Sequence, residues 1–117
     1  MATTYPEPGR TTVALDVLVT IARLTTIDVP GVSRLSSSPP RGLFRRRSLC
    51  EGICVKVEDE IVSADIFVVL DCDVNIREVS RNIQYKVARA ISEMVGMQVG
   101  RINVHVEDID YPTEDEA

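Results

Sequence analysis

The strongest constraint on the fold is a pair of alternating apolar runs at residues 53–58 and 61–70, separated only by Asp59 and Glu60. A hairpin with this two-residue loop places Glu58 opposite Ile61, and the remaining partners follow from that register. One face of the hairpin is then entirely apolar: Ile53, Val55, Val57, Val62, Ala64, Ile66, Val68 and Leu70. The other face is mixed: Cys54, Lys56, Glu58, Ile61, Ser63, Asp65, Phe67 and Val69. Asp-Glu is not a favoured hairpin turn, but the alternation and the turn length both predict this pairing.

Two helices are predicted on either side of the hairpin. In residues 14–27 apolar residues recur at three- and four-residue spacings and are expected to pack on the core: Leu15, Leu18, Ile21, Ala22 and Leu24. Pro30 disfavours helical geometry just beyond. The second helix occupies residues 75–96, with Asn75 as its N-cap and Gly96 after its last turn. Its apolar stripe is expected to face the core: Ile76, Val79, Ile83, Val87, Ile91 and Met94.

Shorter strands complete the predicted sheet. One begins at about residue 31, and the last one runs to Ile109, with Ile102, Val104 and Val106 facing the core. A further strand is expected at residues 11–13. The fold class is therefore α+β, a two-layer sandwich in which two helices cover one face of a mostly antiparallel sheet, in the order β-α-β-β-β-α-β.

The length of 117 residues indicates a single domain. We expect a flexible lead-in at residues 1–10, a domain at 11–109 and an acidic tail at 110–117. Within the domain, residues 36–48 are rich in Pro, Ser and Arg and predict a mobile loop. Aromatic residues make up only 4% of the chain, so the core is expected to be aliphatic.

Composition also bears on location. No apolar run approaches the roughly 20 residues that span a bilayer, and the N-terminus lacks the pattern of a signal peptide. We therefore expect a cytoplasmic protein. Three cysteines are a poor disulfide framework, so we expect thiols; Cys50 and Cys54 lack the further ligands of a structural zinc site.

Motifs for catalysis are absent from the sequence. It contains no G-x-S-x-G, Walker A or G-x-G-x-x-G pattern. The single histidine, His105, is followed by Glu107 and Asp108 and could act as a general base, but no substrate-orienting group can be named beside it. We expect no enzymatic activity, no cofactor, no metal and no small-molecule substrate, and we interpret His105 as part of a contact surface.

The charge is unevenly distributed around a net value of −5. Residues 1–50 carry seven arginines against three acidic residues, whereas residues 51–117 carry six basic residues against fifteen acidic ones. Two basic groups are candidates for contact with an anionic partner, and the alternative interpretation of each is a solvated surface: Arg45, Arg46 and Arg47 in the loop, and Arg77, Arg81 and Arg89 on the second helix. An acidic chain is a poor nucleic-acid binder, so this class ranks second.

Several ordered motifs resemble the bacterial alkaline-shock, or cell-envelope stress response, family. They are Pro30-Gly31-Val32, the Val55 and Val57 strand, Asn75-Ile76 with Val79, Ile83-Gln84 and Val87, and Asn103-Val104 through Asp108-Ile109. The similarity covers about residues 11–109. This chain departs from the family pattern in its Pro- and Arg-rich loop and at Ile102.

The resemblance implies a cytoplasmic, non-enzymatic scaffolding or regulatory protein of the cell envelope. It also implies self-association or a protein partner, with indirect or peripheral membrane association through that partner. The candidate interaction surface is the mixed face of the sheet, on which we expect exposed apolar residues among polar ones: Lys56, Ile61, Asp65, Phe67, Val69, Asn103, His105 and Glu107.

Overall fold

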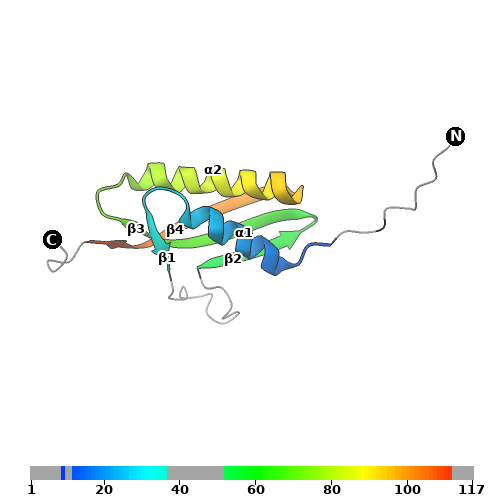
Figure 1. The fold of residues 1–117 in the computed structure, drawn as a ribbon. Coiled ribbons are helices and arrows are strands. Elements are labelled where there is room, and N and C mark those ends of the chain that lie inside the picture. Colours follow the sequence, from blue (N-terminus) through cyan, green and yellow to red (C-terminus); the bar gives the residue numbers. More distant parts are fainter. Residues whose placement is uncertain (1–8, 10–11, 37–51, 112–117) are drawn as a thin grey trace.

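The computed structural model describes residues 9, 12–36 and 52–111. Its elements follow the chain as α1 (Leu15–Ile27), β1 (Val32–Leu35), β2 (Ile53–Glu58), β3 (Ile61–Asp71), α2 (Ile76–Val95) and β4 (Gln98–Asp110). Both helices lie on the same side of one four-stranded sheet (Figure 1). The predicted two-layer α+β sandwich is confirmed. The strand expected at residues 11–13 is not observed. Thr12 and Val13 lead into α1 without strand pairing, and residue 11 lies outside the described part.

Strand β3 is the centre of the sheet. β2 pairs with its first half and β1 with its second half, both antiparallel, while β4 runs parallel along its other edge. The parallel pair follows from chain order, because α2 forms the crossover that a parallel connection needs. The sheet is therefore mostly antiparallel, as predicted.

The hairpin has the predicted register, with Glu58 opposite Ile61 and Ile53 opposite Ile66. Asp59 and Glu60 both have positive φ angles, 53° and 66°, which is the geometry of a tight hairpin turn that matches the twist of its strands. Non-glycine residues rarely adopt this conformation. Burial of the apolar hairpin face against the helices therefore maintains a turn that its own residues disfavour.

Helix α2 begins and ends where the sequence predicts. The Asn75 side chain accepts a hydrogen bond from the Glu78 backbone N–H at 3.0 Å, and Gly96 takes the left-handed conformation with φ of 79°. Val79, Ile83, Val87 and Ile91 are buried as expected. The ends of the predicted stripe are not buried: Ile76 and Met94, in the first and last turns of the helix, are exposed.

Helix α1 contributes fewer residues to the core. Leu18, Ala22 and Thr26 are its buried positions, while Leu15 and Leu24, which we expected to pack inward, are exposed. Gly31 connects α1 to β1 with φ of 99°, and a Cβ there would lie 2.8 Å from Cγ2 of Val79. Glycine at this position thus allows the α1–β1 turn to approach α2 closely.

The core between the layers is aliphatic. The helices pack on Ile53, Val62, Ala64, Ile66, Val68, Leu70 and Ile102 of the sheet. Val104 and Val106 of β4 are partly buried against the same cluster, which confirms the predicted orientation of that strand.

Ser33 and Arg34 of β1 are joined to the end of β4 by Asp110. Its Oδ2 accepts a hydrogen bond from the Ser33 hydroxyl at 2.6 Å and from Nε of Arg34 at 3.2 Å. Asp110, which we assigned to the acidic tail, is instead the last residue of β4. Residues 112–117 of that tail, residues 37–48 of the predicted loop, and all of the lead-in except Gly9 lie outside the described residues.

The stability of the helix layer can be tested at Ile83, which is completely buried. Ile83→Ala is expected to lower the free energy of unfolding by about 2–5 kcal/mol, since it removes buried methyl groups and leaves a cavity. Met94→Ala, at an exposed position of the same helix, is expected to change it by less than about 0.5 kcal/mol. Urea unfolding followed by circular dichroism measures both, and equal losses would contradict the assigned core.

The Asp110 contacts predict a pH dependence. Hydrogen bonds from Ser33 and Arg34 lower the pKa of the Asp110 carboxyl below its ordinary value. A lowered folded-state pKa gives stability that is present above the unfolded pKa of about 3.9 and is lost as the pH falls through the folded value. Asp110→Asn should therefore be less stable than the parent at neutral pH, and the difference should shrink below about pH 4. Thermal unfolding from acidic to neutral pH measures this, and a difference independent of pH would contradict it.

Candidate functional site

The face of the sheet opposite the helices, which we call the open face, holds the predicted interaction surface. The register places seven of its eight residues there, and the eighth, Glu107, is the unpaired residue at a register shift in β4. They come from three strands: Lys56 from β2; Ile61, Asp65, Phe67 and Val69 from β3; and Asn103, His105 and Glu107 from β4. The register sets Asp65 beside Asn103 and Phe67 beside His105. Strand alternation is sufficient to predict this shared face, but the pairing of β3 with β4 is needed to place the residues side by side.

Asp65 is the centre of a polar cluster on this face. Its Oδ1 accepts a hydrogen bond from Nδ2 of Asn103 at 3.1 Å and lies 3.0 Å from Nε2 of His105. Asn103 and His105 are 38 and 40 residues from Asp65 in sequence, so no local motif marks the cluster. The carboxylate that engages His105 is thus not one of the two that follow it. Asp108 instead accepts a hydrogen bond from the Ile109 backbone N–H at 2.8 Å.

The His105 ring is held by a second contact. It stacks on Phe67 with ring centroids 4.5 Å apart and planes inclined by 13°. Phe67 is only 4% exposed, because the imidazole lies over it. The ring is thus fixed by Phe67 below and by Asp65 at its edge, while 44% of the His105 side chain remains exposed.

The predicted exposed apolar patch is therefore wrong. Phe67 and Val69 are buried and Ile61 is half-buried, although neither described helix covers the open face. Val69 lies opposite Arg34 on one side and Asp108 on the other. The Arg34–Asp110 ion pair joins β1 to β4, the two strands that flank β3 at Val69. The accessible part of the open face is polar: Lys56, Asn103, His105 and Glu107 are exposed.

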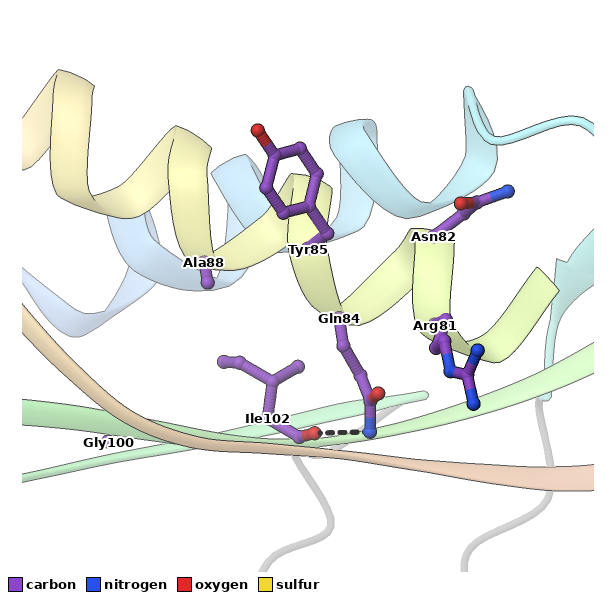
Figure 2. Close-up of a pocket in the computed structure, with 7 residues that line it drawn as sticks. All are labelled: Arg81, Asn82, Gln84, Tyr85, Ala88, Gly100 and Ile102. Carbon is purple, nitrogen blue, oxygen red and sulfur yellow. Dashed lines mark hydrogen bonds between the residues drawn. The ribbon is translucent and has the colours of Figure 1, made fainter. Parts of the chain in front are cut away.

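A hollow of about 570 Å³ between α2 and β4 was not predicted from the sequence. Figure 2 shows Gln84 extending from α2 to β4, where its Nε2 donates a hydrogen bond to the Ile102 carbonyl at 3.1 Å. Arg81 lies beside it, and Tyr85 points away from the strand. A Cβ at Gly100, on the strand side, would lie 2.8 Å from Oγ of Ser63. Only the packing of α2 on β4 brings these residues together, so the sequence holds no signal for the hollow.

The predicted basic row on α2 is interrupted. Arg77, Arg81 and Arg89 are not buried, but Nε of Arg89 lies 2.9 Å from Oε2 of Glu93, and this contact raises the pKa of the guanidinium. Arg77 and Arg81 form no ion pair within the described part of the chain. Arg45, Arg46 and Arg47 lie outside the described residues.

The cysteines differ from our expectation of three thiols. Cys54, on the open face of β2, is disulfide-bonded. Cys72 is a free, half-buried thiol whose pKa is raised by desolvation and by the neighbouring Asp73 carboxylate. A raised pKa lowers the thiolate fraction at neutral pH and so reduces reactivity. Among the residues described, no group of three or more His, Cys, Asp or Glu side chains has the arrangement of a metal site.

The cluster predicts one tautomer for His105. A neutral imidazole next to the Asp65 carboxylate should carry its proton on Nε2, because the carboxylate can only accept. Long-range ¹⁵N–¹H correlation spectra of the neutral form should show the Nε2–H tautomer. In Asp65→Ala this preference should weaken, while Lys86→Ala on α2 should leave it unchanged. A dominant Nδ1–H tautomer in the parent protein would contradict the described contact.

Neither helix is suited to span a membrane. In the part of the chain that the structure describes, no helix has both the length and the apolar character needed to cross a bilayer.

Comparison with solved structures shows the same fold in another protein. A structure described as "MamM CTD - Copper form" superposes with a TM-score of 0.56, covering 80% of this chain and 85% of that one. The sequence identity is 12%, so the likeness concerns the fold alone.

Sequence comparison identifies relatives that match across most of the chain. Spy1535 of Streptococcus pyogenes serotype M6, described as uncharacterized, is 33% identical over 102 residues, covering 86% of this chain and 79% of its own length. YqhY of Bacillus subtilis strain 168, also described as uncharacterized, is 23% identical over 109 residues, covering 91% and 81%. The model of the alkaline-shock protein family, described as having a cell envelope-related function, matches residues 4–111. With the resemblance in its strands and second helix thus confirmed over nearly its whole length, this chain belongs to the alkaline-shock protein family, and its function is related to the cell envelope.

Proposed function

We propose that this protein is a non-enzymatic scaffolding or regulatory protein of cell-envelope homeostasis that binds a protein partner through the open face. It acts in the cytoplasm and reaches the membrane through that partner. The observation that carries the proposal is the Asp65–Asn103–His105 cluster. It presents ordered polar groups on a sheet face that neither described helix covers.

The fixed positions of the side chains in this cluster favour a role in binding over a role in catalysis. Side chains held in place before binding lose less conformational entropy when a partner docks. The side chains of Asp65 and His105 are 40% and 44% exposed, so a partner can reach them. Asp65 Oδ1 already engages two neighbours and the imidazole lies flat on Phe67, an arrangement that holds both groups in position.

The accessible groups indicate what kind of surface a partner needs. Lys56 forms an ion pair with Glu58 at 3.5 Å, and both side chains belong to the open face, so this face has both signs of charge. A face with both signs of charge suits a partner protein whose own surface is polar. Charges on the partner that complement those of the open face would select it and fix how it docks.

Binding of nucleic acid or an anionic membrane through the arginines is the second candidate. Arg77 and Arg81 favour it, since both are accessible and form no ion pair in the described part of the chain. The net charge of −5 and the Arg89–Glu93 pair disfavour it, because they leave little positive field for phosphates.

The function can be tested by complementation. The gene is deleted in a bacterium that carries it, and survival is measured at alkaline pH and with cell-wall antibiotics. Lys56→Glu, which reverses a charge on the open face, should fail to restore survival. The same substitution at Lys86, exposed on α2, should restore it. Both purified variants should unfold at nearly the parent temperature, since they alter exposed side chains.

Two results would contradict the proposal. A deletion strain with normal survival under envelope stress would contradict the role in the envelope. Full restoration of survival by each of the single variants Lys56→Glu and Glu107→Lys would show that the open face is not the functional surface. Loss of function in Arg77→Glu and Arg81→Glu alone, with the open-face variants active, would instead favour the anionic partner.

A further inference from the structure

Helix α1 is apolar on both of its sides. Its inner side contributes Leu18, Ala22 and Thr26 to the core at four-residue spacing. Its outer side carries Val17, Leu24 and Ile27, which are 47%, 58% and 47% exposed. A helix that is apolar all round is normally buried on all sides, so the outer side of α1 is suited to a further contact.

The spacing of the outer residues is that of a helix pair. Val17, Thr20, Leu24 and Ile27 alternate steps of three and four, which is the a and d pattern of one helix packing against another. All four are exposed. We call them the outer seam. It continues along the helix and is distinct from the inner stripe, which is fully used by the sheet and α2.

The charges of α1 indicate what covers this seam. Asp16 and Arg23 are its only charged residues, and they are seven residues apart, so they lie on the same flank of the seam. Each immediately precedes a seam residue, Val17 or Leu24, and thus takes the position that forms ion pairs between helices. Neither forms an ion pair within the described residues.

A second copy of the same helix complements this pattern in one orientation. When two identical helices pair antiparallel, the same flank of each helix meets, and Asp16 of one copy approaches Arg23 of the other. A two-fold axis at the level of Thr20 makes this contact twice. In a parallel pair this flank would face the partner's other flank, where Arg23 would meet the C-cap Asp28 but Asp16 would meet only Ile21. Only the antiparallel pair therefore gives both charged residues of the helix an opposite charge.

We propose that two copies of this chain associate through the outer seam of α1, antiparallel, with reciprocal Asp16–Arg23 ion pairs at the rim. This deepens the proposed function by naming a second copy as one partner, but it uses a different surface. The open face lies on the opposite side of the sheet from α1 and stays accessible in such a dimer (Figure 1).

The charge pattern permits a specific test by sedimentation equilibrium of the full chain. Asp16→Arg gives a helix with two arginines, and Arg23→Asp gives one with two aspartates. Each variant alone places like charges in both rim contacts, so its dimer dissociation constant should rise roughly tenfold or more. An equimolar mixture restores both contacts as opposite charges, so the two variants should form a heterodimer close to parent affinity.

The apolar seam has its own matched pair of variants. Leu24→Glu should abolish association, whereas Met94→Glu, at an exposed apolar position on α2, should leave it unchanged. Circular dichroism of each variant confirms that the fold is retained, since both sites lie outside the core.

Three outcomes would overturn the proposed dimer. They are a monomeric parent protein across the concentration range, a charge-variant mixture that associates no better than its components, and association that survives Leu24→Glu. Failure of the dimer is distinguishable from failure of the proposed function, because Lys56→Glu leaves α1 intact and should dimerise like the parent.

Discussion

The burial of strand β3 on both faces is the constraint on which the rest of the structure depends. Residues 66–70 are buried without interruption, although alternate side chains point to opposite sides of the sheet. On the helix side, the core of α1 and α2 accounts for this burial. On the open face the neighbours of β3 are polar: the His105 ring stacks on Phe67, and Val69 lies between Arg34 and Asp108 in the register. β3 also provides hydrogen-bonding partners for β1, β2 and β4, so both of its edges are satisfied.

This arrangement gives the open face its chemical character. A two-layer domain of this size leaves one sheet face without a second core, and apolar side chains there would favour non-specific association. Here an imidazole stacks on Phe67, and the polar groups around it and at Arg34 and Asp110 are linked across strands. The result is a polar surface with fixed side chains, which is why the proposal for this face concerns recognition of a partner. The disulfide-bonded Cys54 lies in the same region, opposite Asp65 in the register.

The two helices play different roles although they lie in one layer. α2 is amphipathic: its apolar stripe is buried and its opposite side carries charged residues, so one face is enough to stabilise it. α1 carries only two charged residues and lacks a side-chain cap at its N-terminus, so it depends on burial more than α2 does. Its inner side rests on β1, β2 and α2, and a matching contact on its outer side would resolve the remaining exposure of Val17, Leu24 and Ile27.

Most of the fold could be predicted from sequence because its signals are local. The hairpin register follows from alternation around a two-residue loop, and both ends of α2 follow from Asn75 and Gly96, whose side chain and conformation act within one turn. The errors have a common origin. A spacing of three and four cannot tell which side of α1 faces the sheet, so it assigns Leu24 inward. It also cannot tell which members of an apolar stripe stay exposed in the first and last turns of a helix, so it assigns Ile76 and Met94 to the core.

The candidate site shows the same division more sharply. The sequence alone determined that Asp65, Phe67, Asn103 and His105 share one face of the sheet, since alternation fixes the side to which each side chain points. Only the tertiary structure decided that β4 lies beside β3 in a register that sets Asp65 between Asn103 and His105 and places the imidazole over Phe67. The physical reason is that strand pairing across a 38-residue separation depends on how α2 packs on the sheet. No pattern within a single strand records that packing.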